Sequence, residues 1–229
     1  MTQNGAIHDN ETRARVLRAA ARLFAERGFN HVSIRDICAE AGSNVAAVNY
    51  HFGDKLGLYR ELIGVVAEGM NDTNISALDT GVGRSPEEQL RGYIRGFLHQ
   101  LLDPNPKETC WLEKLVARET MEPTPALDLI IEKGIKPAAA RLHKLVGEVT
   151  GLPADDSRVI LSAGAVQGLC LWYRSSRVMT ERMFPELQFT PERIDKLAEF
   201  VADFSLAGMR ALVSGRADCD GVLRNLVPG

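Results

Sequence analysis

The sequence lacks most of the residue patterns that mark enzymes and metal sites. It has no G-x-S-x-G motif, no glycine-rich phosphate loop and no H-E-x-x-H pair. Its cysteines stand far apart and form no Cys-x-x-Cys, so we expect reduced and mostly packed thiols. They are Cys38, Cys110, Cys170 and Cys219. The sequence therefore predicts neither a metal nor a cofactor, and it disfavours an enzyme.

Long apolar runs are also missing. No stretch approaches the roughly 18 apolar residues that cross a membrane. The first residues, MTQNGAIHDN, lack the apolar core of a secretory signal. Strand-like alternation of apolar and polar residues is absent as well. We therefore expect an all-α protein that acts in the cytoplasm and has no membrane partner.

The chain lacks a net positive charge, and its charges are unevenly divided. The formal net charge is -3, which argues against a protein that coats nucleic acid through bulk charge. The first 60 residues hold eight Lys and Arg against six Asp and Glu, a balance of +2, and the remaining residues carry -5. A mildly basic head on an acidic body leaves room for a local nucleic-acid contact.

The spacing of apolar residues in the head predicts three helices joined by glycine-containing turns. The helices span residues 11–27, 33–41 and 45–52. Gly28 and Gly42 stand where they can end the first two helices. Side chains that can cap the following helices stand before each of them. These are Ser33, Asn44 and Asp54.

Capping signals and helical spacing predict longer helices beyond the head. One starts at Lys55, and the others span about residues 85–102, 110–119, 124–150, 155–177 and 190–215. Ser85 and Glu88 match a capping box. Pro137 lies inside a predicted helix, so we expect a kink or a break there. The residues after Arg216 look like a loose tail.

The second and third predicted helices match a helix-turn-helix, whose second helix lies in the DNA major groove. That helix lies in SNVAAVNYHF, residues 43–52, and has no Lys or Arg. Charge need not lie there, because phosphate contacts set affinity while base-edge contacts set sequence preference. Arg35, Lys55 and Arg60 can supply the charge from neighbouring helices. Arg35 is the best candidate for a bidentate contact with guanine.

Helical spacing gives this third helix an inner and an outer face. Val48 and Phe52 should face the core of the head, whereas small, polar and aromatic residues point outward. We expect alanine methyl groups to meet thymine methyl groups, and Asn49 to read an adenine. Tyr50 and His51 can donate to phosphates, although a lone histidine such as His51 is more often an ordinary surface or capping residue. Similar helical trios also occur in proteins that do not bind DNA.

Residues 13–59 resemble the DNA-binding domain of the TetR family of bacterial transcriptional regulators. The likeness rests on A-x-x-L-F-x-x-x-G-F in the first helix, SIRDICAEAG in the second and Y-H-F-x-x-K after them. In that family the third helix reads the major groove, and the resemblance implies that Lys55 touches a phosphate. The positions implied in DNA contact are Ser33, Arg35, Asn44, Val45, Ala46, Ala47, Asn49, Tyr50, His51 and Lys55.

The chain departs from the family pattern at two of these positions. Many members have lysine or another long polar residue where Val45 stands, and tyrosine where Asn49 stands. The departure indicates a different operator, not the loss of DNA binding.

The helical body is far larger than a reading head requires. One helix-turn-helix touches a single half-site, and two copies held about 34 Å apart bind usefully, so we expect a homodimer. Its interface is predicted on residues 159–173 and 194–212, where small residues permit close helix approach. The small residues of the first helix are Ala163, Gly164, Ala165 and Gly168, and the candidate residues of the second helix are Ala198, Val201, Ala202 and Leu206. Packing of both helices within one subunit is the alternative.

Residues 118–137, RETMEPTPALDLIIEKGIKP, look like the C-terminal domain of the CecR-type branch of the family. TetR-family bodies are usually ligand-binding dimers in which an inducer moves the connecting helix, and this branch is linked to responses to antibiotics and other toxic compounds.

A ligand pocket is mostly apolar with a few polar groups. The candidates for its lining are Phe97, His99, Leu101, Trp111, Leu115, Arg118, Glu119, Met121, His143, Gln167, Cys170 and Trp172. Each also has a plainer explanation, which is core packing for the tryptophans and a pair that ties helix ends for Arg118 and Glu119.

We therefore predict an all-α chain with a helix-turn-helix DNA-binding domain in residues 1–54 and a helical ligand-binding and dimerisation domain in residues 55–229. The predicted function is that of a homodimeric repressor, bound to double-stranded operator DNA and released by a small hydrophobic or toxic inducer. A ligand-insensitive DNA-binding dimer is the first alternative, and a helical enzyme is the least favoured.

Overall fold

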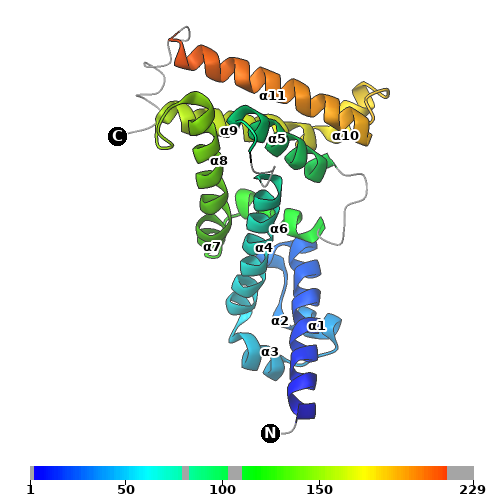
Figure 1. The fold of residues 1–229 in the computed structure, drawn as a ribbon. Helices are drawn as coiled ribbons and strands as arrows, with labels where there is room; N and C mark the ends of the chain where they lie inside the picture. The colour runs from blue at the N-terminus through cyan, green and yellow to red at the C-terminus, as the bar shows by residue number, and fades with distance from the viewer. Residues whose placement is uncertain (1–2, 79–82, 103–109, 216–229) are drawn as a thin grey trace. The chain divides into compact units, whose positions relative to one another are not determined.

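The computed structural model describes residues 3–78, 83–102 and 110–215, and in these ranges the chain is helical without a strand (Figure 1). The prediction of an all-α fold is confirmed. The α-helices are α1 (Gln3–Arg27), α2 (Ile34–Ala41), α3 (Val45–Phe52), α4 (Lys55–Leu78), α5 (Pro86–Leu102), α6 (Cys110–Met121), α7 (Leu127–Ile130), α8 (Lys136–Thr150), α9 (Ser157–Ser175), α10 (Arg177–Met183) and α11 (Pro191–Val213). A 3-10 turn lies at Phe29–His31 and a π-helical turn at Ile131–Ile135.

The chain divides into two compact units, each with its own hydrophobic core. The first joins residues 1–71 with 106–136, and the second joins 72–105 with 137–229. The predicted boundary between residues 54 and 55 separates the DNA-binding part of the chain from the ligand-binding and dimerisation part. The two units of the structure are instead defined by packing. That boundary therefore stays a prediction.

The core of the first unit forms where α1, α2 and α3 meet the first half of α4. Phe24, Phe29 and Tyr59 make an aromatic cluster there, with the ring of Tyr59 centred 4.9 Å from that of Phe24 and 4.8 Å from that of Phe29. The predicted inner face of α3 is confirmed, because Val48 and Phe52 are both buried in this core.

Helix α1 ends against a side chain from α6. Gly28 has a left-handed backbone (φ 83°), so it ends the helix as its position in the sequence predicts. The guanidinium of Arg118 donates to the carbonyls of Ala25 (3.0 Å) and Glu26 (2.6 Å). A cation at the C-terminal end of a helix also interacts favourably with the helix dipole. The first unit is thereby tied across 93 residues of sequence.

The second unit is built around α11, which packs against both α5 and α9 (Figure 1). Leu90, Ile94 and Leu98 of α5 are fully buried in its core. Ion pairs line the outside of the α5–α11 contact. They join Glu87 to Arg210, Arg91 to Asp203, Arg95 to Asp195 and Glu199, and His99 to Asp195.

The start of α1 and the division of one long helix differ from the predictions, whereas the break expected near Pro137 in a second long helix is present. Helix α1 begins at Gln3, eight residues before the predicted start at Glu11. The helix predicted over residues 124–150 is divided into α7, a π-turn and α8. The helix predicted over 155–177 is divided at Ser176 into α9 and α10.

The π-turn precedes Pro137, where a kink or break is expected. Proline has no N–H, and its ring collides with the carbonyl four residues before it in a regular helix. The wider turn relieves this conflict, with the N–H of Lys136 bonded to the carbonyl of Ile131. The tail predicted after Arg216 lies outside the described residues.

Candidate nucleic-acid interface

Local caps fix the two helices of the helix-turn-helix. The hydroxyl of Ser33 accepts from the N–H of Asp36 (3.2 Å), and the Asp36 carboxylate accepts from the N–H of Ser33 (2.8 Å), which is a capping box. Asn44 accepts from the N–H of Ala47 (2.9 Å) at the start of α3. Gly42 takes the left-handed conformation (φ 58°) in the turn between them. The predicted caps of α2 and α3 are confirmed.

The outer face of α3 is open to solvent. Tyr50 is 76% exposed, and Val45, Ala46 and Asn49 are exposed beside it, while Ala47 is half-buried. A helix of eight residues with an exposed outer face can enter the major groove of DNA, which is wide enough to admit an α-helix.

Two cations on the neighbouring helices α2 and α4 lie in different environments. Arg35 on α2 is exposed and has no ion-pair partner among the described residues. Lys55 is half-buried at the start of α4, with its ammonium 4.3 Å from the ring centre of Phe29. Burial lowers the pKa of Lys55. Two other arginines nearby are paired, Arg13 with Glu61 and Arg22 with Glu40.

Three of the residues predicted to contact DNA also have bonding partners within the head. The side chain of His51 is only 7% exposed, and its Nε2 lies 3.3 Å from a carboxylate oxygen of Asp9 on α1. The hydroxyl of Ser33 and the amide oxygen of Asn44 serve as helix caps. The amide N–H groups of Asn44 are not used in that cap.

Sequence reasoning missed Asp9 as a partner of the reading helix. The apolar spacing predicts a helix only from Glu11 onward, because residues 3–10 have few apolar positions that reveal a periodic face. The proximity of Asp9 to His51, 42 positions along the chain, is set by tertiary packing and has no local signal.

The residues predicted for a ligand pocket are divided between the two units. Those in the first unit are Trp111, Leu115, Arg118, Glu119 and Met121, and those in the second are Phe97, His99, Leu101, His143, Gln167, Cys170 and Trp172. Leu115 and Cys170 are core residues, whereas Met121 is 85% exposed and Trp172 is also exposed. Burial raises the pKa of Cys170 to about 12. The pocket stays a prediction.

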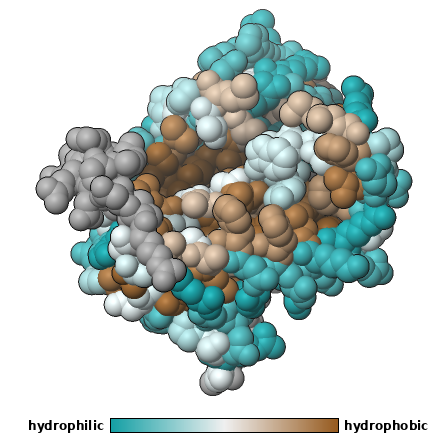
Figure 2. Space-filling view, turned by 90° about the horizontal axis from the view of Figure 1, so that it is seen from above, coloured by the Kyte–Doolittle hydropathy of each residue, from teal (hydrophilic) through white to brown (hydrophobic). Residues whose placement is uncertain are grey.

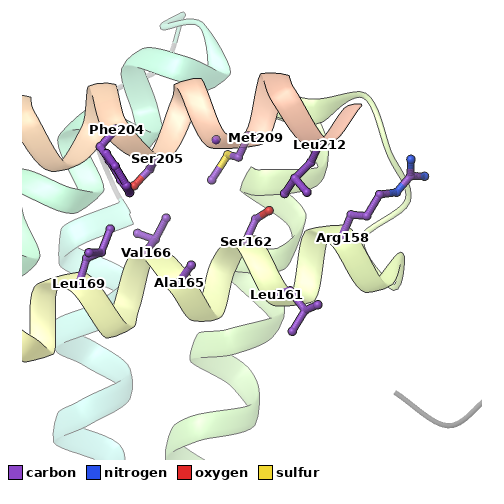
Figure 3. Close-up of a pocket in the computed structure, with 11 residues that line it drawn as sticks. Arg158, Leu161, Ser162, Ala165, Val166, Leu169, Phe204, Ser205, Met209 and Leu212 are labelled. Atoms are coloured by element: carbon purple, nitrogen blue, oxygen red, sulfur yellow. The ribbon is translucent and has the colours of Figure 1, made fainter. Parts of the chain in front are cut away.

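A groove of about 300 Å³ separates the exposed parts of α9 and α11 (Figure 3). It is lined mainly by apolar side chains, among them Leu161, Leu169, Phe204 and Leu212, with Gly208 on its α11 wall. Figure 2 shows apolar residues gathered around a hollow on this side of the molecule, rimmed by hydrophilic ones.

The predicted interface residues on α9 and α11 lie on two different faces of these helices. Gly164, Ala165 and Gly168 are exposed. The others are buried in the core of the second unit, which corrects their assignment to an intersubunit surface: Ala163, Ala198, Val201, Ala202 and Leu206. The sequence does not separate the two faces, because small residues occupy both.

Within the described residues, no helix is both long enough and apolar enough to cross a membrane. The same part of the chain holds no cluster of three or more His, Cys, Asp or Glu side chains arranged for a metal ion.

Helix α3 is capped, faces solvent and follows α2 after a glycine-containing turn. This arrangement is a helix-turn-helix, a motif of DNA-binding proteins. The sequence profile of the bacterial regulatory proteins of the tetR family matches residues 16–62. The profile of the C-terminal domain of the HTH-type transcriptional dual regulator CecR matches residues 86–209. The chain therefore belongs to the TetR family of transcriptional regulators, in the branch with a CecR-type C-terminal domain.

Relatives of similar length agree with this assignment. The HTH-type transcriptional dual regulator CecR of Shigella flexneri is 30% identical over 177 residues, 73% of this chain and 78% of that protein. The HTH-type transcriptional repressor NicS of Pseudomonas putida is 24% identical over 203 residues, 88% and 93% of the two chains. The crystal structure of a TetR-family regulator from Streptomyces coelicolor shares the fold, with a TM-score of 0.63, 18% identity and coverage of 87% and 96%.

Proposed function

We propose that the protein is a homodimeric, ligand-responsive repressor that binds a palindromic operator. The observation that carries the proposal is the exposed outer face of α3, with the cations Arg35 and Lys55 on the helices that precede and follow it. The relatives are named as transcriptional regulators, one of them as a repressor, which supports regulation rather than catalysis. The protein would act in the cytoplasm, where the operator lies.

Base reading on this face would depend on small apolar groups and one amide. Val45, Ala46 and Ala47 present methyl groups that suit the C5-methyl of thymine. Asn49 is exposed and can pair with the N6 and N7 edge of adenine. Arg35 can give two parallel hydrogen bonds to a guanine. The face without charge thus favours an operator whose contacted bases include A·T pairs.

Phosphate contacts would come from the edges of the same face. Lys55 supplies a cation, and the hydroxyl of Tyr50 and the amide N–H groups of Asn44 supply donors. The backbone N–H groups at the start of α3 also favour an anion. Ser33 and His51 would act mostly by holding α2 and α3 in place, since the Ser33 hydroxyl and the Nε2 atom of His51 already have partners.

Dimerisation would use the outer faces of α9 and α11. Phe200 and Phe204 are 61% and 60% exposed, and their rings stack with centres 6.3 Å apart. Apolar surface of this kind is unfavourable in water, whereas a second copy can cover it. Gly164 and Gly168 on α9 would let a partner helix approach closely, because a Cβ at either site would meet no atom within 4 Å.

Release by a ligand rests on the CecR-type domain and on the predicted pocket residues. A small hydrophobic or toxic compound remains the proposed inducer. A constitutive DNA-binding dimer is the alternative. It would be favoured if no compound in a broad panel of antibiotics and other toxic compounds released the operator complex.

Selection of DNA sites from a random pool, by the purified protein at physiological salt, tests the central claim. We expect a two-fold symmetric consensus whose half-sites lie about one helical turn apart. Recovery of unrelated sequences, bound no better than the starting pool, would remove the operator-reading role.

Lys55→Ala is expected to weaken binding to all DNA sequences by a similar factor. Loss of one phosphate contact per subunit should also reduce the slope of log K against log salt by about 1 per half-site. Titration of the selected operator at several salt concentrations measures both quantities. An unchanged salt slope would show that Lys55 does not neutralise a phosphate.

Arg35→Ala is expected to relax the preference at one base pair of each half-site, at a cost of about 1–3 kcal/mol for the preferred operator. Competition between operators that differ at single positions measures the effect. A similar loss on every DNA sequence would identify Arg35 as a phosphate contact instead.

A further inference from the structure

Glu119, near the end of α6, is the one charged side chain that is buried among the described residues, with 1% of its surface exposed. Removing a carboxylate from water is unfavourable unless hydrogen-bond donors surround it. Its surroundings therefore indicate what the residue is for.

Three donors reach the Glu119 carboxylate. The hydroxyl of Tyr59 lies 2.6 Å from Oε1, the hydroxyl of Thr124 lies 2.9 Å from the same oxygen, and the N–H of Thr124 lies 3.1 Å from Oε2. An ionised carboxylate accepts hydrogen bonds and donates none, so this set of partners suits it. Burial, followed by the bond to Glu119, raises the pKa of Tyr59, which keeps its hydroxyl a donor.

Tyr59 connects this carboxylate to the lysine of the candidate interface. Lys55 and Tyr59 are four residues apart in α4 and thus share one side of the helix. Both contact Phe29, the Lys55 ammonium at 4.3 Å from the ring centre and the Tyr59 ring at 4.8 Å. The order of contacts is Glu119, Tyr59, Phe29 and Lys55, and all four belong to the first unit.

We propose that Glu119 is a positioning residue for DNA binding, which sets the place of the Lys55 ammonium through Tyr59 and Phe29. The inference rests on the proposed phosphate contact of Lys55. It gives the end of α6 an indirect effect on operator affinity, because a shift of Glu119 would be passed to Lys55 through Tyr59 and Phe29. The neighbouring Arg118, on the same turn of α6, also fixes the end of α1 through its hydrogen bonds to the last carbonyls of that helix.

A double-mutant cycle on operator binding tests the coupling. Glu119→Gln in the wild-type background is expected to weaken binding about 5- to 10-fold and to lower the salt slope, because the lysine loses its place. In the Lys55→Ala background the same change is expected to cost less than about 2-fold. Tyr59→Phe keeps the ring but removes the hydroxyl, so it should reproduce the pattern, including where Glu119→Gln does not fold.

A matched control separates positioning from general stability. Leu115→Val alters a fully buried residue one turn before Glu119 on α6, which lies in the same core but takes no part in the hydrogen bonds and ring contacts that join Glu119 to Lys55. It should lower the unfolding temperature, while any effect on binding should be equal in both backgrounds.

Two contrary results lead to different conclusions. Equal losses from Glu119→Gln and Tyr59→Phe with and without Lys55 would overturn the positioning role while the phosphate contact of Lys55 stands. A Lys55→Ala single variant with unchanged affinity and salt slope would overturn both, and the site-selection result would still decide operator reading.

Discussion

Phe204→Glu is expected to convert the proposed dimer to a monomer and to weaken operator binding by about 10²–10⁴-fold. The loss is large because the second helix-turn-helix no longer benefits from the effective concentration that dimerisation gives it. This is the largest effect on binding that we expect from a single exposed side chain.

The physical reason lies in the position of Phe204 on the outer face of α11. It is exposed, stacks on Phe200 and lines the apolar groove between α9 and α11 (Figure 3). In a two-fold dimer each substitution occurs twice in the same interface. A carboxylate in this apolar interface would lose its hydration without gaining a cation or a hydrogen-bond donor, which is strongly unfavourable.

Molar mass in solution, together with operator titration, checks this result. Met121→Glu is the matched control, since it places the same charge on a more exposed apolar side chain in the first unit, and it should leave the protein dimeric. A dimeric Phe204→Glu variant would place the interface elsewhere. A monomer with wild-type affinity would show that dimerisation does not drive binding.

The features that the sequence predicted well are those with local causes. Ser33, Asn44 and Ser85 each stand three positions before the residue that they cap, and all three caps are present. The buried face of α3 follows from helical spacing, since Val48 and Phe52 are four residues apart. Capping and periodicity need no knowledge of distant residues, so the elements of the helix-turn-helix could be placed with little error.

The features that the sequence did not predict depend on contacts between distant segments. The pairing of His51 with Asp9 and the bond between Tyr59 and Glu119 join positions 42 and 60 residues apart. Small residues on α9 and α11 give no sign of which face is buried, because Ala163 is buried whereas its neighbour Gly164 is exposed. Hydrophobic spacing predicts that a face exists, but only the packed structure shows what covers it.

Gly57→Ala is expected to destabilise the head by about 1–3 kcal/mol and to weaken operator binding at the same time. Gly57 lies in the first turn of α4, directly beside the end of α3. A Cβ atom at this position would lie 2.0 Å from the backbone carbonyl oxygen of Phe52, far inside contact distance. The backbone of the turn must move to admit it.

That movement would also displace α3, because the turn between α3 and α4 is short and is held by hydrogen bonds. The N–H of Gly57 donates to the Asp54 carboxylate (2.7 Å), and the N–H of Asp54 donates to the Phe52 carbonyl (3.0 Å). Phe52 itself is anchored in the core. Displacing its carbonyl therefore tilts the end of α3 or breaks these bonds, and either result disturbs the face that would meet DNA.

A second glycine in the same helix supplies the control. A Cβ atom at Gly69 would meet no atom within 4 Å, so Gly69→Ala should stabilise α4 by about 0.5–1 kcal/mol through helix propensity alone. Denaturant unfolding should show a lower stability for Gly57→Ala and a higher stability for Gly69→Ala. Operator titration measures the binding of both variants. Equal stabilisation by the two alanines would mean that the α3–α4 turn can open freely, and the tight coupling between α4 and the reading helix would then be wrong.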